Sequence, residues 1–302
     1  MSSTPAVAYA DAVFACAVGL AAHYTRPIVV SARRYDGRVQ CGAGAFVVLN
    51  EDGWILTAAH LLEPATLHAG HQAEIARHDA AAREIAAGEG TASGKAKRVR
   101  SLGVNPGWIR NYSIWTGWEG RSVAEFHVLP GADLALGRIE PFDPALVSSY
   151  PVLRDPATLV PGTTVCKLGY PFHSVSTTFD EAAGTFVFAE GALPMPLFAL
   201  EGMITRLRSG SRTPGGSPPV TYVETSTPGL RGQSGGPIFD AEGRLCAIQV
   251  HTVHYPLGFS PPFTEQGGRR VEEHQFLNVG VGVSAETILR FLARYGVRVA
   301  GS

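Results

Sequence analysis

Short hydrophobic runs separated by glycine and proline extend along most of the chain. The runs are rich in Val, Ile, Leu and Phe, and 35 glycines and 21 prolines interrupt them every few residues. Many short strands joined by turns are typical of a β-barrel or a β-sandwich. The expected strands occupy residues 27–33, 44–49, 54–58, 123–128 and 134–139 in the first half, and 164–168, 185–189, 202–207, 220–224, 237–239, 245–250 and 276–283 in the second.

The two ends of the chain predict helices instead. Thr4-Pro5 has the form of a helix start, with Thr as the cap and Pro at the first helical position, and an Ala-rich helix is expected to run to about Ala22. Near the other end, Ser284 is expected to cap an amphipathic helix over residues 285–294.

An insertion and two loops interrupt the strands. Residues 72–87 are Ala-rich, charged and helical in period, and they predict a helical insertion that extends to about residue 100. The basic stretch 95–100 is interpreted as a solvated loop. Residues 209–219 and 255–268 are rich in Pro and Gly and predict long, flexible loops.

Composition and charge exclude several classes of protein. Of the 302 residues, 45% are hydrophobic and 17% charged, so the chain can form a core and is not disordered. The 25 Lys and Arg nearly balance the 26 Asp and Glu, leaving a net charge of -1. Proteins that bind phosphate backbones usually carry a basic excess, so we expect neither a nucleic-acid partner nor a membrane partner.

The longest apolar run, residues 12–22, is too short to cross a bilayer, which takes about 20 residues. No basic residue precedes it, since the first cation is Arg26, and a signal peptide has a basic leader. A cytoplasmic location is therefore expected, with secretion as the alternative. The cysteines are too few and scattered for a disulfide scaffold and predict mostly buried free thiols: Cys16, Cys41, Cys166 and Cys246.

The sequence GQSGGP at residues 232–237 is the strongest chemical signal. A serine hydroxyl is a weak nucleophile, and it needs an exposed position in a tight turn beside backbone N–H groups that stabilise an oxyanion. The glycines around Ser234 permit such a turn. Taken alone, the same sequence also suits an ordinary hairpin turn.

Two further segments complete a catalytic set. In GWILTAAH, residues 53–60, an apolar strand ends in small residues and delivers His60 at its exit. In GADLAL, residues 131–136, Asp133 precedes an alternating apolar strand. A carboxylate in that place can orient an imidazole through its Nδ1 hydrogen. Each residue alone has a plain structural explanation, whereas the order His60, Asp133, Ser234 is specific.

With these motifs the chain resembles the trypsin-like serine peptidases, whose two signature motifs TAAH and GQSGGP match. The closer resemblance is to the HtrA/Deg-type and glutamyl-endopeptidase-like branches, without a PDZ domain in this chain. It rests on LGYPF at 168–172, EGMIT at 201–205 and GVGVS at 280–284, and it covers residues 27–296. It implies an all-β fold of two antiparallel six-stranded Greek-key β-barrels, chymotrypsin-like, with the active site in the cleft between them and a helix at each end.

The resemblance also implies a division of the chain. Residues 1–26 would be an N-terminal helical extension, and 27–145 the first β-barrel with its insertion at about 72–100. Residues 146–160 would be a linker, and 161–296 the second β-barrel with the C-terminal helix.

The roles of the site residues follow from the same resemblance. Ser234 attacks the peptide carbonyl, His60 transfers the proton and Asp133 fixes the tautomer of His60. The backbone N–H groups of Gly232 and Ser234 form the oxyanion hole. The implied activity is that of a serine endopeptidase on protein or peptide substrates, with no cofactor and no metal.

The chain departs from the family at several positions. Gln233 stands where zymogen-activated peptidases carry an Asp, so activation by a freed N-terminus is not expected. Cys41 matches half of the first-barrel disulfide, but its partner position is Leu61. The second-barrel cystine positions are Val165 and Asp240, so these disulfides are absent, as suits a reducing compartment.

The specificity pocket is less clear from the sequence. Counting back from Ser234 places Pro228 where trypsin-like cleavage after Lys or Arg needs an Asp. Gln249 stands where glutamyl endopeptidases have a His, and His251, two residues on, can still face the cleft. These residues favour a small or medium apolar residue before the cut.

Four alternatives stay open. The chain can be a catalytically silent trypsin-like binding module, a latent protease that an unknown partner activates, or an esterase that uses the same triad. The histidines His68, His71 and His78, with His251 and His254, suggest a metal-binding protein, although their spacings complete no metal-ligand set.

Overall fold

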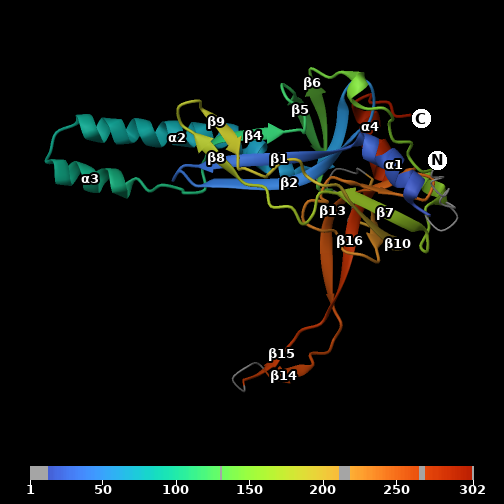
Figure 1. The fold of residues 1–302 in the computed structure, drawn as a ribbon. Coiled ribbons are helices and arrows are strands. Elements are labelled where there is room, and N and C mark those ends of the chain that lie inside the picture. Colours follow the sequence, from blue (N-terminus) through green and yellow to red (C-terminus); the bar gives the residue numbers. More distant parts are fainter. Residues whose placement is uncertain (1–12, 130, 211–217, 265–268, 301–302) are drawn as a thin grey trace, which may run out of the picture.

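The computed structural model describes residues 13–129, 131–210, 218–264 and 269–300, and it contains two β units joined by a linker (Figure 1). The first unit is a six-stranded antiparallel sheet in the order β4-β1-β2-β3-β6-β5. Its strands are β1 (Thr25–Arg34), β2 (Val39–Val48), β3 (Trp54–Ala58), β4 (Ile109–Trp115), β5 (Ser122–Leu129) and β6 (Leu134–Glu140).

The second unit is a closed barrel in the order β10-β11-β16-β13-β12-β7. Its strands are β7 (Thr164–Gly169), β10 (Phe198–Ser209), β11 (Thr221–Thr225), β12 (Pro237–Phe239), β13 (Leu245–Pro256) and β16 (Phe276–Ser284). Two small ribbons are attached, β8 (Thr177–Asp180) with β9 (Thr185–Phe188) and β14 (Pro262–Thr264) with β15 (Arg270–Glu272). The expected all-β chymotrypsin-like fold is confirmed.

The first unit is a curled sheet rather than the closed barrel that we expected. Within the described part of the chain, no strand ladder joins β4 to β5. Side chains of α2 (Glu63–Ala87) occupy the free edge of β4 instead. Gln72 donates to the carbonyls of Ile109 and Arg110 at 2.9 and 3.0 Å, and Ile109 N–H donates to His71 Nδ1 at 3.2 Å. The helix therefore satisfies backbone groups that a sixth strand pairing would otherwise use.

These contacts also account for the histidines of the insertion. His68 Nε2 donates to the Arg110 carbonyl, His71 accepts from β4, and His78 Nδ1 lies 3.2 Å from the Tyr35 hydroxyl. Among the residues that the structure describes, no group of three potential metal ligands occurs. His68 and His71 therefore support the sheet edge, and His78 contacts Tyr35.

The insertion is more helical than the sequence indicated. The helix expected over 72–87 already begins at Glu63, because Pro64 occupies a first-turn position that suits proline. The basic stretch 95–100, interpreted as a loop, lies in α3 (Ala92–Ser101), which Thr91 caps by accepting from Gly94 N–H. Figure 1 shows α2 and α3 as a hairpin that projects from the first sheet. None of the described helices is long and apolar enough to cross a membrane.

Of the remaining predicted helices, strands and loops, some were confirmed and others were wrong. The C-terminal helix is α4 (Ala285–Arg294), capped by Ser284 as predicted, whereas the sequence did not indicate β4 or β8. The loop expected at 255–268 instead contains the end of β13 and the strand β14, because β13 and β16 continue as a projecting ribbon (Figure 1). Residues 1–12, 211–217 and 265–268 lie outside the described part, with the Thr4-Pro5 start and most of the 209–219 loop.

The largest hydrophobic cluster of buried residues extends through both units. Helix α1 (Ala15–Tyr24) leads directly into β1 of the first unit, yet it packs on the second: Phe14 meets Phe239 edge to face, and the Tyr24 hydroxyl donates to the Gly243 carbonyl at 3.3 Å. Burial raises the pKa of Tyr24 well above its usual value. The N-terminal helix thus fastens the two units together on the side away from the projecting hairpin.

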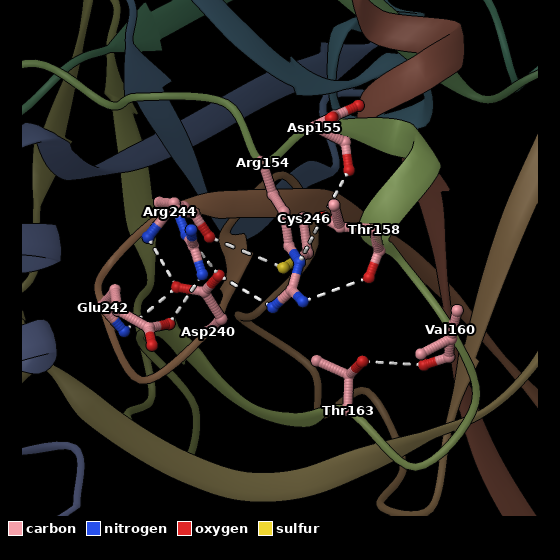
Figure 2. Close-up of polar contacts among 9 residues, drawn as sticks. All are labelled: Arg154, Asp155, Thr158, Val160, Thr163, Asp240, Glu242, Arg244 and Cys246. Atoms are coloured by element: carbon pink, nitrogen blue, oxygen red, sulfur yellow. Dashed lines mark hydrogen bonds and ion pairs between the residues drawn. The ribbon is translucent and has the colours of Figure 1, made fainter.

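The linker is held on the second barrel by a buried carboxylate (Figure 2). Asp240, whose side chain is 2% exposed, accepts from Arg154 Nη1 at 2.9 Å and from Arg244 Nε at 2.8 Å. Its other oxygen accepts from the backbone N–H groups of Glu242 and Arg244. Arg154 lies in the linker, so these bonds tie it to the turn between β12 and β13.

All four cysteines are free thiols.

Removing the Asp240 carboxylate is expected to destabilise the fold strongly. Asp240→Ala leaves the Arg154 charge and two backbone N–H groups without their partner, and we expect the free energy of unfolding to fall by about 3 kcal/mol. Urea denaturation measures this. The matched control is Glu242→Ala, which removes an exposed partner of Arg244 and should change stability by less than about 0.5 kcal/mol. Equal effects of the two changes would contradict the assignment.

Candidate active site

His60 is placed by the end of β3. The strand is buried from Ile55 to Ala58 and passes into a 3₁₀ turn, Ala59–Leu62, that carries the ring outward. The Asp133 carboxylate accepts from the His60 backbone N–H at 2.9 Å and lies 2.8 Å from His60 Nδ1. The Ala59 N–H donates to the Asp133 carbonyl at 3.1 Å. Both the position and the orientation of the imidazole are therefore fixed by one residue.

Asp133 holds this position in a strained backbone conformation. It has φ +49°, in the left-handed region, and directly precedes β6. Pairing of Leu134 with Ala58 brings it beside the end of β3. A non-glycine residue in this region costs about 1–3 kcal/mol, and the bonds to residues 59 and 60 offset the strain.

The Ser234 turn lies between the two units. The Ser234 carbonyl accepts from Ala45 N–H on β2 at 2.8 Å, and Gly235 N–H donates to the Gln249 carbonyl on β13 at 2.7 Å. Gly235 has φ +82°, and a β-carbon there would stand 2.1 Å from the Ala45 carbonyl oxygen. Only glycine permits this approach, so the turn is clamped from both sides.

Two backbone donors beside Ser234 are free to bind an oxyanion. In the described part of the chain, neither the Gly232 N–H nor the Ser234 N–H has a hydrogen-bond partner. Gly232 has φ +94°, its carbonyl accepts from Tyr170 N–H at 2.9 Å, and a β-carbon would lie 2.3 Å from the Tyr170 oxygen. The buried Gln233 closes the turn, because its Oε1 accepts from Leu230 N–H at 3.0 Å.

The sequence-predicted residues surround Ser234 in two adjoining cavities. His60, Gly232 and Ser234 line a cavity of about 700 Å³, and no hydrogen bond joins the His60 ring to the Ser234 hydroxyl among the described contacts. A second cavity of about 370 Å³ also contacts Ser234 and is lined by the three residues expected in the specificity pocket, Pro228, Gln249 and His251. Asp133 is not among the residues that line these two cavities and contacts the larger one through His60.

Polar side chains line part of the smaller cavity, and two of them, His254 and Asn278, were not expected there from the sequence. Gln249 is 1% exposed, and its Nε2 donates to the His251 carbonyl at 2.7 Å and to the Val281 carbonyl at 3.1 Å. Burial lowers the pKa of the His251 imidazole, which favours its neutral form. His254 and Asn278 join this lining because β13 and β16 pair in register there, a pairing between positions far apart in the chain.

Lys167 supports this cavity from inside the second barrel. It is fully buried on β7, and its ammonium donates to the carbonyls of Thr227 and Pro228 at 2.7 and 2.8 Å and to the Thr225 hydroxyl at 3.2 Å. Burial lowers its pKa to about 7. A lone lysine within the apolar run at 164–169 was the available sequence signal, and its function as a support for the loop at 227–229 was missed.

One known protein family matches more than half of the chain. The family model for the trypsin-like peptidase domain matches residues 42–248. The chain belongs to the trypsin-like peptidase family. This is a family of serine endopeptidases, as the resemblance implied. No curated protein matches the chain.

Solved structures with similar folds include proteases of the HtrA type. "HtrA-type protease AlgW with tripeptide" is 14% identical with a TM-score of 0.47, and the match covers 93% of this chain and 64% of that one. An inactive form of Rv3671c from M. tuberculosis H37Rv is 15% identical with a TM-score of 0.45, covering 98% and 96%. The chain thus spans less than two thirds of the AlgW length.

The buried lysine predicts a rise of stability with pH. Its pKa is 10.5 when unfolded and about 7 when folded, so the folded protein binds fewer protons between these values. The free energy of unfolding should therefore rise with pH across this window, by up to about 1.4 kcal/mol per pH unit from this residue. Urea denaturation from about pH 7.5 to about pH 9 measures the slope. Lys167→Met should remove this contribution, and an unchanged slope in that variant would refute the prediction.

Proposed function

We propose that this chain hydrolyses peptide bonds within proteins or peptides through a triad of His60, Asp133 and Ser234 and an acyl-enzyme intermediate. The observation that carries the proposal is the double contact of the Asp133 carboxylate with His60, at its backbone N–H and at Nδ1. It leaves the other ring nitrogen of His60, Nε2, for the cavity that Ser234 shares.

The chemistry follows from this arrangement. Ser234 Oγ attacks the carbonyl carbon while His60 Nε2 takes the hydroxyl proton, and the carbonyl oxygen gains the negative charge. The free N–H groups of Gly232 and Ser234 would stabilise that oxyanion, each contributing about 3 kcal/mol. The carbon–nitrogen bond then breaks as His60 returns the proton to the amine. Water attacks the ester by the same route and releases Ser234.

Asp133 acts on the imidazole rather than on the substrate. A negative carboxylate at Nδ1 stabilises the imidazolium that forms in each proton transfer, and the bond to the backbone N–H keeps the ring from turning. The unpartnered oxyanion donors support an enzyme whose site is formed. A latent enzyme that awaits a partner is the second candidate, because the His60 ring and the Ser234 hydroxyl are not hydrogen-bonded to each other.

A fluorophosphonate probe tests the nucleophile directly. We expect wild-type protein to be labelled at Ser234, and the variants Ser234→Ala and His60→Ala to lose labelling, because one removes the nucleophile and the other its base. Intact mass spectrometry measures the adduct. The matched control is Ser226→Ala, a serine of the same barrel outside both cavities. Labelling that persists in Ser234→Ala would refute the proposal, and an unlabelled wild type would favour the latent enzyme.

Asp133→Asn tests the triad more finely. The amide keeps the shape of the carboxylate but favours the wrong tautomer of His60, so kcat should fall by about 10⁴-fold while the fold stays intact. Peptide hydrolysis and circular dichroism measure the two effects. A loss of less than about tenfold would show that Asp133 is not the orienting carboxylate.

A further inference from the structure

The two cavities at Ser234 take opposite halves of a peptide substrate if the proposed function holds. The leaving amine receives its proton from His60, so the residues after the scissile bond must lie on the His60 side. His60 lines the larger cavity, together with Cys41, Ala43 and Phe172, and does not line the smaller one. The larger cavity is therefore the place for the leaving-group residues.

Phe172 is exposed to an unusual degree in the wall of that larger cavity. The residue is 82% exposed, more than any other large hydrophobic residue of the described chain. Exposed apolar surface is unfavourable in water, at about 25 cal/mol per Å². An aromatic ring held open to solvent in a cavity that contains the nucleophile is typical of a surface that a ligand covers.

The backbone of Phe172 is strained as well. It has φ +59°, and the only other described non-glycine residue with a positive φ is Asp133, a member of the triad. An aromatic residue rarely adopts this conformation, and such strain persists where neighbouring bonds enforce it. Strained residues gather at functional sites, which is the pattern seen here.

Bonds on both sides keep the Phe172 turn in place. Before it, Tyr170 N–H donates to the Gly232 carbonyl at 2.9 Å, and the Tyr170 hydroxyl donates to the Thr25 carbonyl at 3.1 Å. After it, His173 Nε2 donates to the Ala192 carbonyl at 2.8 Å. The turn is thus anchored to Gly232, the glycine of the proposed oxyanion hole.

A second aromatic ring extends this surface. Phe198, at the start of β10 and 37% exposed, meets Phe172 edge to face with ring centres 5.3 Å apart. Val175 also lines the cavity, together with the small residues Gly42 and Ala43. The result is an apolar shelf, Phe172 and Phe198, beside room for a side chain.

We propose that Phe172 and Phe198 form a subsite for an apolar side chain of the substrate on the leaving-group side of the scissile bond. The subsite rests on the proposed peptidase activity. Its occupant is one of the first residues after the cut, since Phe172 lines the same cavity as Ser234 and His60, and Phe198 extends the apolar surface beside it. Covering the Phe172 ring supplies the binding energy. The smaller cavity then selects the residues before the cut.

The experiment compares cleavage before and after removal of the ring. Wild-type protein digests a peptide library, and mass spectrometry of the products should show apolar residues enriched at the first or second position after the cut. In Phe172→Ala this enrichment should disappear. For the best peptide found, kcat/KM should fall about tenfold, because covering an aromatic ring is worth about one order of magnitude in affinity.

A second substrate separates binding from damage to the active site. An anilide with the same acyl-side residues but no residue after the cut cannot reach the shelf, so Phe172→Ala should leave its kcat/KM within about twofold of wild type. Phe172→Tyr keeps the ring and should restore cleavage of the peptide. Phe259→Ala is the matched control, because Phe259 is 59% exposed and lies outside the cavity.

The possible results distinguish a failure of the proposed subsite from a failure of the proposed peptidase activity. Cleavage by wild type without apolar enrichment, or an equal loss on peptide and anilide in Phe172→Ala, would overturn the subsite while leaving the peptidase intact. Cleavage of neither substrate by wild type, with no difference from Ser234→Ala, would overturn the proposed function and the subsite with it.

Discussion

The close approach of the Ser234 turn to the first sheet is the constraint on which the site depends. Ser234, the proposed nucleophile, belongs to the barrel, whereas His60 and Asp133 belong to the sheet, so the proposed chemistry needs the two units to be held in a fixed arrangement. The hydrogen bond from Ala45 to the Ser234 carbonyl holds them, and it forms only because Gly235 has no β-carbon to meet β2. A side chain at residue 235 would push the two units apart and so move Ser234 away from His60 and Asp133.

Buried ionisable side chains, rather than disulfides, hold the loops around this contact. Asp240 fastens the linker through Arg154, and Lys167 carries the loop of the smaller cavity on two carbonyls. Such groups stabilise the fold only while every partner is present, since an unpaired charge in the interior is costly. They also fix geometry sharply, because each bond has a defined direction. Burial raises the pKa of the Cys246 thiol to about 12, so this thiol stays protonated and is a poor nucleophile.

Backbone strain among the described non-glycine residues occurs at two positions near the site. Asp133 and Phe172 both adopt left-handed backbone conformations that their side chains disfavour. In each case hydrogen bonds from neighbouring residues enforce the conformation: those to residues 59 and 60 for Asp133, and those of Tyr170 and His173 for Phe172. The first conformation aims a carboxylate at His60, and the second presents an aromatic ring to the cavity.

The sequence by itself determined most of the strands, the Ser284-capped helix and the three residues of the proposed triad, because each follows from neighbouring positions: an alternation, a cap, or a motif at a strand end. Tertiary structure alone decided that α2 covers the edge of β4, that Lys167 supports the pocket and that Phe172 stands exposed. Those outcomes depend on hydrogen bonds and packing between segments far apart in the chain. The local pattern of hydrophobic and polar positions does not indicate such distant partners.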